Sequence, residues 1–241
     1  MSILEVDNVS VRFGGLTAVD RVSLAVEEGT VMGVIGPNGA GKTTLFNVIA
    51  GIQPATYGAV FLEGEDITRL GAHQRARRGL SRTFQRLEVF GTLTVRENLL
   101  VAAESRRRWD RSVKPAAVVD DLIERLGLGP VIAKDADSLP TGTQRLVELA
   151  RALATGPRVV LLDEASSGVS TFETAAMSSL LRDLAAGGLT VVLVEHDMEF
   201  VMGLCDRVAM LDHGVLVADG SPAEVQLNPA VQAAYLGTGV G

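Results

Sequence analysis

The chain has 241 residues, which allows one large domain or two small ones with a full apolar core. Its 22 basic and 29 acidic residues give a net charge of −7, which argues against a general attraction to nucleic acid or to anionic lipid. The single cysteine, Cys205, cannot form an internal disulfide, no apolar run approaches the roughly 20 residues of a membrane-spanning helix, and residues 1–5 lack the features of a secretory signal.

The chain begins with predicted strands of two kinds. Apolar and polar residues alternate over residues 3–11 and around 22–26, which predicts half-exposed strands that pair antiparallel. A continuous apolar run follows at 31–35, and similar runs occur at 159–162, 191–194 and 208–211. Such runs are typical of strands covered on both faces, so we expect a parallel sheet.

The sequence Gly-Pro-Asn-Gly-Ala-Gly-Lys-Thr at residues 36–43 lies between an apolar run and a helix-like run, and it matches the phosphate-binding P-loop. The glycines let backbone N–H groups approach phosphate oxygens at the positive end of the helix dipole. Lys42 is expected to reach the β- and γ-phosphates and to act in catalysis, Thr43 to bind Mg²⁺, and Thr44 to contact phosphate. The expected nucleotide contacts of this loop are Gly36, Asn38, Gly39, Ala40, Gly41, Lys42, Thr43 and Thr44.

From about residue 71 to residue 155 the chain has helical periodicity, many arginines and no convincing buried strand. This predicts a helical subdomain inserted into the α/β core. Gln85 is a candidate contact to the metal or to the attacking water, although a lone glutamine in a loop usually has no such role. Two arginine clusters, around Gln85 and around Trp109, fit solvated helix faces better than nucleic-acid binding, and they also suit a docking surface for a protein.

Two carboxylates directly follow the apolar run 159–162, at the strand end where open α/β sheets bind ligands. Asp163 is expected to hold Mg²⁺, directly or through its water, and Glu164 to polarise the water that attacks the γ-phosphate. His196 follows the run 191–194 and should reach the same edge. It is a candidate γ-phosphate contact, and the alternative is a hydrogen-bonded histidine at a strand end.

The last third of the chain completes an α/β pattern. Residues 171–186 have the length and spacing of a crossover helix, and residues 215–218 predict a hairpin with the preceding strand. Short helices are expected at 222–225 and 229–236, the second with Asn228 as its N-cap.

In this order, residues 36–43, Gln85, residues 139–145, Asp163-Glu164 and His196 resemble the Walker A, Q-loop, signature, Walker B and switch-histidine motifs of the ATP-binding cassette (ABC) ATPases. The resemblance covers nearly the whole chain and implies a P-loop NTPase (RecA-like) core with a parallel sheet, N-terminal antiparallel strands and an inserted helical subdomain. It implies ATP and Mg²⁺ as cofactors, with Gln85 and His196 in catalysis. It adds Phe13, Val19, Thr141, Gly142 and Thr143 to the expected nucleotide contacts.

Residues 12–19, 82–85 and 228–237 are similar to the ATPase subunits of branched-chain amino acid importers. That similarity implies a head-to-tail dimer with a second cassette, identical or homologous. It also implies transmembrane permease subunits near Gln85 and an extracytoplasmic solute-binding protein, with no nucleic-acid partner. The chain would then be cytoplasmic, held at the inner face of the cell membrane through the permease.

Four positions depart from the family pattern. Pro140 and Thr143 replace the usual serine and glutamine of the signature motif, while Gly142 is retained. Ala165 replaces the proline after the glutamate, and Ser170 replaces the aspartate of the D-loop. The hydroxyls of Thr141 or Thr143 are expected to serve as substitute donors at the start of the signature helix.

We therefore expect a single ABC ATPase domain over residues 1–241, with its α/β core at about 1–70 and 156–221, its helical subdomain at about 71–155 and C-terminal helices at 222–241. The expected function is the Mg²⁺-dependent ATPase of an importer for branched-chain or related amino acids. The alternatives are a cassette for lipid export or iron–sulfur assembly, and a regulatory ATP-binding module with weak turnover. No Asn-Lys-x-Asp or Thr-Lys-x-Asp motif is present to support a GTPase.

Overall fold

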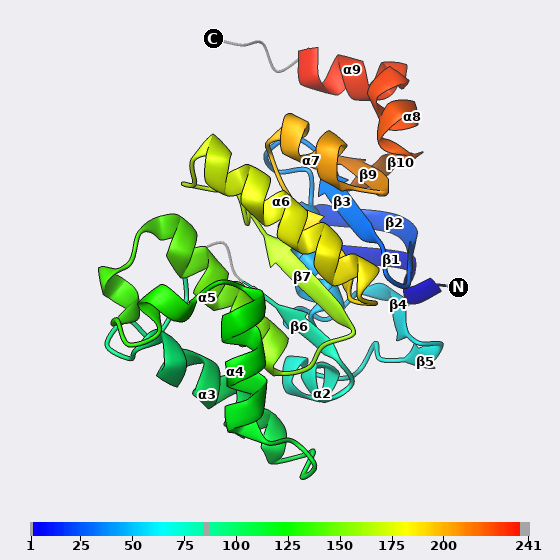
Figure 1. The fold of residues 1–241 in the computed structure, drawn as a ribbon. Coiled ribbons are helices and arrows are strands. Elements are labelled where there is room, and N and C mark those ends of the chain that lie inside the picture. Colours follow the sequence, from blue (N-terminus) through cyan, green and yellow to red (C-terminus); the bar gives the residue numbers. More distant parts are fainter. Residues whose placement is uncertain (1, 84–86, 237–241) are drawn as a thin grey trace.

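The structure is a computed structural model that describes residues 2–83 and 87–236. The molecule has an α/β core, and a group of helices lies beyond one edge of its central sheet (Figure 1). The C-terminal helices lie at the opposite edge. This arrangement leaves the carboxyl ends of the central strands open for a ligand.

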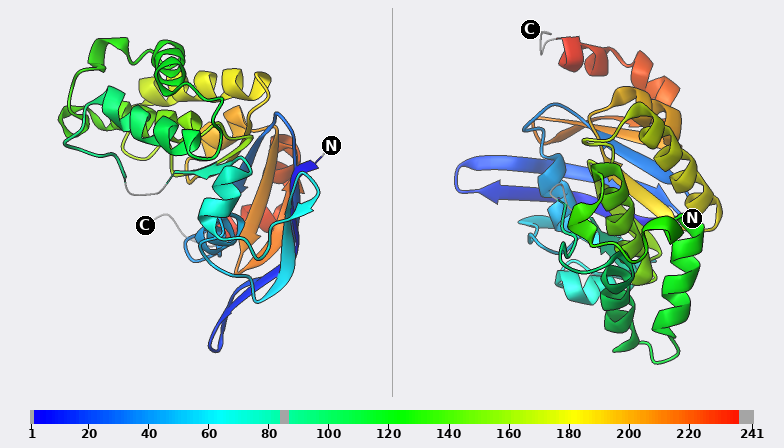
Figure 2. Two further views of the ribbon diagram at one scale, coloured as in Figure 1. Left: turned by 90° about the horizontal axis from the view of Figure 1, so that it is seen from below. Right: turned by 60° about the vertical axis from the view of Figure 1, so that its left-hand side comes forward.

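The N-terminal sheet has the strand order β2-β1-β4-β5, and each neighbouring pair is antiparallel, as predicted for the first two strands. Its strands are β1 (Ser2–Phe13), β2 (Leu16–Glu27), β4 (Tyr57–Leu62) and β5 (Glu65–Asp66). Buried and exposed residues alternate over the second half of β2, because one face packs on the core and the other meets solvent. The β1–β2 hairpin extends well beyond the rest of the core (Figure 2).

The central sheet has the strand order β10-β9-β3-β8-β7-β6. Its strands are β3 (Val31–Ile35), β6 (Leu80–Arg82), β7 (Val159–Asp163), β8 (Thr190–Val194), β9 (Arg207–Asp212) and β10 (Val215–Gly220). Neighbouring strands are parallel except β9 and β10, which form the predicted hairpin. Every residue of β3, β7 and β8 is buried, so the predicted parallel strands are confirmed.

Alternate residues of the central strands enter two apolar cores. On β7, Val159 and Leu161 pack with the N-terminal sheet and α1 (Lys42–Ile49). Val160 and Leu162 pack instead with α6 (Thr171–Ala186) and α7 (Met198–Leu204), in a core that also holds Cys205. Burial raises the pKa of the Cys205 thiol to about 12, as suits a core residue.

The remaining predicted helices are also present. The helix predicted over residues 171–186 is α6, and the short C-terminal helices are α8 (Pro222–Leu227) and α9 (Pro229–Leu236). The Asn228 side chain accepts a bond of 2.9 Å from the Ala230 N–H, which confirms it as the N-cap of α9. Within the described ranges, no helix has the length and apolar character that crossing a bilayer requires.

The group of helices beside β6 and β7 consists of α3 (Val95–Arg107), α4 (Pro115–Arg125) and α5 (Thr141–Ala154), with short 3₁₀ turns at Gly129–Val131 and Ala136–Ser138. These helices surround their own apolar core. The α5 helix joins this group to the central sheet, since its Val147 lies in the helical core and its Leu149 in the core beneath α6.

The expectation of no buried strand between residues 71 and 155 is wrong at β6, which pairs parallel with β7 at the edge of the central sheet. Three residues are too few for apolar periodicity, and two of the three are polar. Ser81 is satisfied inside the fold by a hydrogen bond of 2.6 Å to Thr155. Together with α2 (Ala72–Arg77), this strand brings the start of the predicted helical region into the core.

Arg75 in α2 is a fully buried arginine that fastens the end of the P-loop helix. It is 2% exposed and donates to the carbonyl oxygens of Val48 and Ile49 at 2.7 Å each. Further bonds reach the carbonyls of Leu70 at 2.9 Å and Thr68 at 3.0 Å. Burial lowers the pKa of Arg75 to about 10, so the side chain stays charged at neutral pH.

We expect Arg75→Met to lower the free energy of unfolding by about 3 kcal/mol, because it removes the four hydrogen bonds that the buried guanidinium donates to backbone carbonyls. Urea unfolding at pH 7 measures the change. The matched control is Arg78→Met, which removes only an exposed ion pair with Glu65 and should change stability by less than about 0.5 kcal/mol. Equal stabilities of the two variants would contradict a structural role for Arg75.

Candidate nucleotide-binding site

A pocket of about 470 Å³ opens where the carboxyl ends of the central strands meet the N-terminal hairpin. Its wall combines the P-loop, the hairpin, the residues that follow β7 and β8, and the β9–β10 turn. The sequence-predicted residues that line it are Phe13, Asn38, Gly39, Ala40, Gly41, Lys42, Thr43, Thr44, Glu164 and His196. The fold thus gathers five separate stretches of the chain around one cavity.

Two glycines of the P-loop have no room for a side chain. Gly36 has φ of 144°, and a Cβ there would lie 2.0 Å from the Leu211 carbonyl oxygen. Gly41 has φ of 100°, and its Cβ would lie 2.4 Å from the Ala18 carbonyl oxygen. The loop is therefore held tightly between β9 and β2, which leaves its N–H groups as the surface offered to an anion.

Lys42 is the buried cation of this pocket. It is 6% exposed, and its Nζ donates to the carbonyl oxygens of Gly36 at 2.6 Å and Pro37 at 3.0 Å. Burial lowers the pKa of Lys42, while the nearby carboxylates of Glu164 and Asp163 oppose that shift. A partly desolvated ammonium at the mouth of a P-loop is a strong ligand for phosphate.

Glu164 and His196 meet beside the P-loop. The histidine Nε2 lies 2.9 Å from a Glu164 carboxylate oxygen, and the two residues follow the neighbouring strands β7 and β8. Glu164 has φ of 52°, and its N–H donates to the Val194 carbonyl at 2.9 Å. Its side chain is 16% exposed and that of His196 is 48% exposed, so both can reach a ligand in the pocket.

Asp163 lies deeper, behind the pocket wall. Its carboxylate forms an ion pair of 2.8 Å with Arg82 of β6, and the two side chains are only 4% and 7% exposed. The Asp163 N–H donates to the Thr83 hydroxyl at 3.3 Å. Asp163, the predicted metal ligand, is therefore held in place by β6, the strand that sequence analysis did not predict.

The donor set fits Mg²⁺. Arg82 already places a cation against the buried Asp163 carboxylate, and Thr43 lines the pocket one residue from Lys42. Among the residues that the structure describes, no cluster of three metal-ligating side chains occurs. One or two carboxylates commonly bind Mg²⁺ together with substrate phosphates, so Asp163 and the Thr43 hydroxyl are the groups of this chain that would hold it. Gln85, also predicted to contact the metal, lies outside the described residues.

Several predicted nucleotide contacts do not line this pocket. Val19 is fully buried and would be 3.4 Å from a Cβ at Gly41, so it supports the P-loop from beneath. Thr141, Gly142 and Thr143 begin α5 and do not contribute to the wall. A Cβ at Gly142 would lie 2.3 Å from a Glu173 carboxylate oxygen, because the start of α5 packs against the start of α6.

Two of the residues that depart from the family pattern, Pro140 and Ser170, lie at the starts of α5 and α6. Pro140 occupies the N-cap position of α5 with φ of −57°, without a side-chain capping bond. Ser170 caps α6: its hydroxyl donates to the Glu173 carboxylate at 2.7 Å and its N–H does so at 2.9 Å. These replacements therefore keep both helices intact.

Sequence reasoning missed the roles of several residues at this edge of the sheet. Glu195 is 2% exposed and accepts bonds of 2.7 Å from both the N–H and the hydroxyl of Ser166. Burial raises the pKa of Glu195, although these bonds stabilise its charged form. His213 lines the pocket from the β9–β10 turn. The position of Glu195 at the end of a predicted strand was only a weak signal for a role at this edge. Neither its bonds to Ser166 nor the place of His213 in the pocket could be inferred from sequence spacing.

Comparison with known proteins agrees with this geometry. The family model "ABC transporter" matches residues 19–167, and the model "Branched-chain amino acid ATP-binding cassette transporter" matches residues 215–241. The chain is 40% identical to the high-affinity branched-chain amino acid transport ATP-binding protein BraF of Pseudomonas aeruginosa, with 98% of each chain covered. It is 33% identical to the lipopolysaccharide export system ATP-binding protein LptB of Escherichia coli, also over 98% of each.

The fold is similar to that of a nucleotide-free ATP-binding cassette from an ABC transporter, with a TM-score of 0.88, 31% identity and 100% of each chain covered. That match covers the whole chain, so it includes both sheets and the helical group. The chain therefore belongs to the ABC transporter family, as an ATP-binding cassette that couples ATP hydrolysis to transport.

Proposed function

We propose that this chain is the Mg²⁺-dependent ATPase subunit of an importer for branched-chain or related amino acids. The observation that carries the chemical part is the Glu164 carboxylate, 2.9 Å from His196 Nε2 in the wall of the P-loop pocket. The cargo is inferred from the similarity to BraF and from the match of residues 215–241 to the branched-chain family model.

In the proposed site the triphosphate lies along the P-loop, where N–H groups and Lys42 bind its β- and γ-phosphates. Mg²⁺, held by Thr43 and Asp163, supplies charge neutralisation to the phosphates. Glu164 accepts the proton of the attacking water, and His196 orients that carboxylate through their shared hydrogen bond. Phe13, 48% exposed at the hairpin tip, offers its ring to the adenine.

A second cassette would complete the site. Thr141, Gly142 and Thr143 lie outside this chain's own pocket, at the start of a helix that has no side-chain cap. Free N–H groups at a helix start bind anions, so they suit the γ-phosphate of a nucleotide held by a partner cassette. The hydroxyls of Thr141 and Thr143 would replace the missing polar groups of the signature motif.

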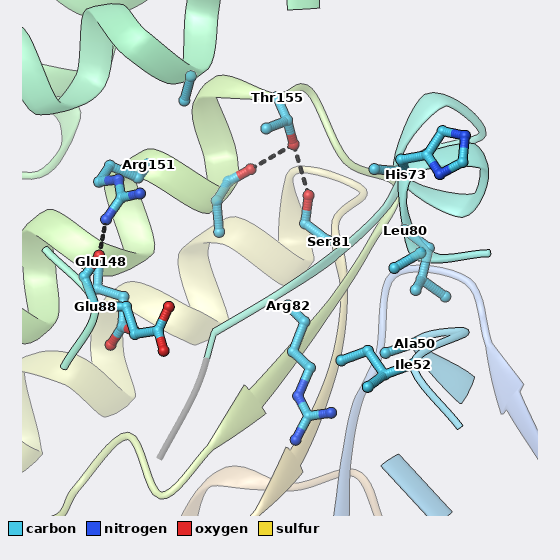
Figure 3. Close-up of a pocket in the computed structure, with 14 residues that line it drawn as sticks. Ala50, Ile52, His73, Leu80, Ser81, Arg82, Glu88, Glu148, Arg151 and Thr155 are labelled. Carbon is cyan, nitrogen blue, oxygen red and sulfur yellow. Dashed lines mark hydrogen bonds between the residues drawn. The ribbon is translucent and has the colours of Figure 1, made fainter. Parts of the chain in front are cut away.

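A transmembrane partner would dock at a groove of about 380 Å³ between α2, β6 and α5 (Figure 3). The groove is lined by apolar side chains such as Ile52 and Leu80 and by charged ones such as Glu88 and Arg151. Apolar side chains with arginines among them are common in protein interfaces, which supports a protein partner here. The extracytoplasmic solute-binding protein would contact the permease and not this chain.

The deciding experiment measures Mg²⁺–ATP hydrolysis as a function of the concentration of the purified chain. Specific activity that rises with concentration would support an active homodimer. ATP binding without turnover, persisting after addition of copurified permease subunits, would favour the regulatory module instead. Copurification with lipid-export components, in place of two permeases and a solute-binding protein, would favour the alternative suggested by the similarity to LptB.

A further inference from the structure

Arg82 is the last residue of β6, and its guanidinium reaches three elements of the nucleotide site. Its Nη2 donates to Asp163 at 2.8 Å, its Nη1 donates to the Asn47 side chain in the P-loop helix α1, and its Cζ lies 5.9 Å from the centre of the Phe46 ring. Figure 3 shows this side chain pointing away from the groove residues Thr155 and Arg151. The arginine therefore faces the P-loop side of the sheet.

The Arg82–Asp163 pair is almost fully removed from solvent. A carboxylate that is 4% exposed is costly without a counter-ion, and removal of its cation leaves a buried, uncompensated charge. Asn47 and Phe46 hold the guanidinium in place from α1. Arg82 thus places a positive charge directly against this buried carboxylate.

We propose that Arg82 is a built-in counter-ion of Asp163 that is exchanged for the metal when Mg²⁺–ATP binds. The inference rests on the proposed role of Asp163 in holding Mg²⁺. Two cations beside one buried carboxylate repel each other, so the ion pair must loosen when the metal occupies this place. Arg82 would lower the affinity for Mg²⁺–ATP and keep the empty site stable.

The backbone next to Arg82 has its own bonds to β7. Thr83, the residue after Arg82, is fixed to β7 by its N–H to the Leu161 carbonyl at 2.9 Å and by its hydroxyl to the Asp163 N–H at 3.3 Å. The end of β6 is thus fixed to β7 by these two bonds as well as by the Arg82–Asp163 ion pair. Loss of the ion pair would therefore leave the backbone of Thr83 in place.

The test compares Arg82→Met with the wild-type chain by calorimetric titration with the non-hydrolysable β,γ-imido analogue of ATP, in excess Mg²⁺ or in EDTA. We expect roughly tenfold tighter binding in Mg²⁺, the value of one charge-assisted hydrogen bond, and no tighter binding in EDTA. The melting temperature of the ligand-free variant should fall, and its deficit should shrink with Mg²⁺ and analogue. Loss of an arginine that contacts nucleotide would have the opposite effect on affinity.

Arg78→Met, which removes an exposed arginine from the same region, is the control and should leave both dissociation constants unchanged. Asn47→Ala removes the hydrogen bond that Arg82 donates to Asn47, and it should tighten Mg²⁺-dependent binding by a smaller factor. This variant replaces Arg82→Met in the titration if Arg82→Met does not fold. Equal or weaker binding by these variants in Mg²⁺ would overturn the exchange. A wild-type affinity that is the same in Mg²⁺ and EDTA would instead overturn the proposed metal role.

Discussion

Glu164→Gln is expected to retain ATP binding and to lower hydrolysis by about a thousandfold, because the amide cannot accept the proton of the attacking water. The amide can still accept a hydrogen bond from His196, so the pocket wall keeps its shape. Steady-state phosphate release gives the rate, and nucleotide titration gives the affinity. ATP that cannot be hydrolysed should also accumulate a dimer, which light scattering detects.

The control for this substitution is Glu104→Gln, in an exposed ion pair on α3 far along the chain from the pocket. It should hydrolyse ATP at the wild-type rate. An undiminished rate in Glu164→Gln would remove Glu164 from its role as the base. A loss of both binding and turnover would point to a damaged pocket and not to a missing base.

Lys42→Ala should weaken ATP binding by about a hundredfold, since a buried ammonium contributes a charge-assisted bond to the phosphates that alanine cannot replace. The same change removes the hydrogen bonds that Lys42 donates to the carbonyls of Gly36 and Pro37. Circular dichroism and urea unfolding should therefore accompany the titration, to show that the fold survives.

Lys134→Ala is the matched variant, because Lys134 is exposed and does not line the pocket. It should bind ATP as the wild-type chain does. If Lys42→Ala were folded and bound ATP with unchanged affinity, the triphosphate could not lie along the P-loop as proposed.

The parts of the fold that the sequence predicted are those with long or repeated patterns. The strands β3, β7 and β8 are continuous apolar runs, and the helix α6 spans the sixteen residues that its spacing indicated. Because Glu164 and His196 each follow such a strand, their meeting at one edge could be expected from topology.

The parts that the sequence did not predict depend on contacts between distant residues. Arg82 and Asp163 are separated by 81 positions, and β6 is too short to register as a strand. In the sequence, Arg82 was one arginine of a cluster that fits a solvated helix face. Its burial follows from the pairing of β6 with β7, which no local pattern encodes.

At Glu164 the backbone is left-handed, so the residue that would be most stable at this position differs from the residue that the proposed chemistry needs. A residue other than glycine at φ of 52° destabilises the fold by about 1 kcal/mol relative to glycine. Asparagine would tolerate this conformation better than glutamate does. Glycine at position 164 would remove that cost, and with it the carboxylate that lies 2.9 Å from His196 Nε2. The turn after β7 therefore cannot be relaxed in this way without losing the proposed base.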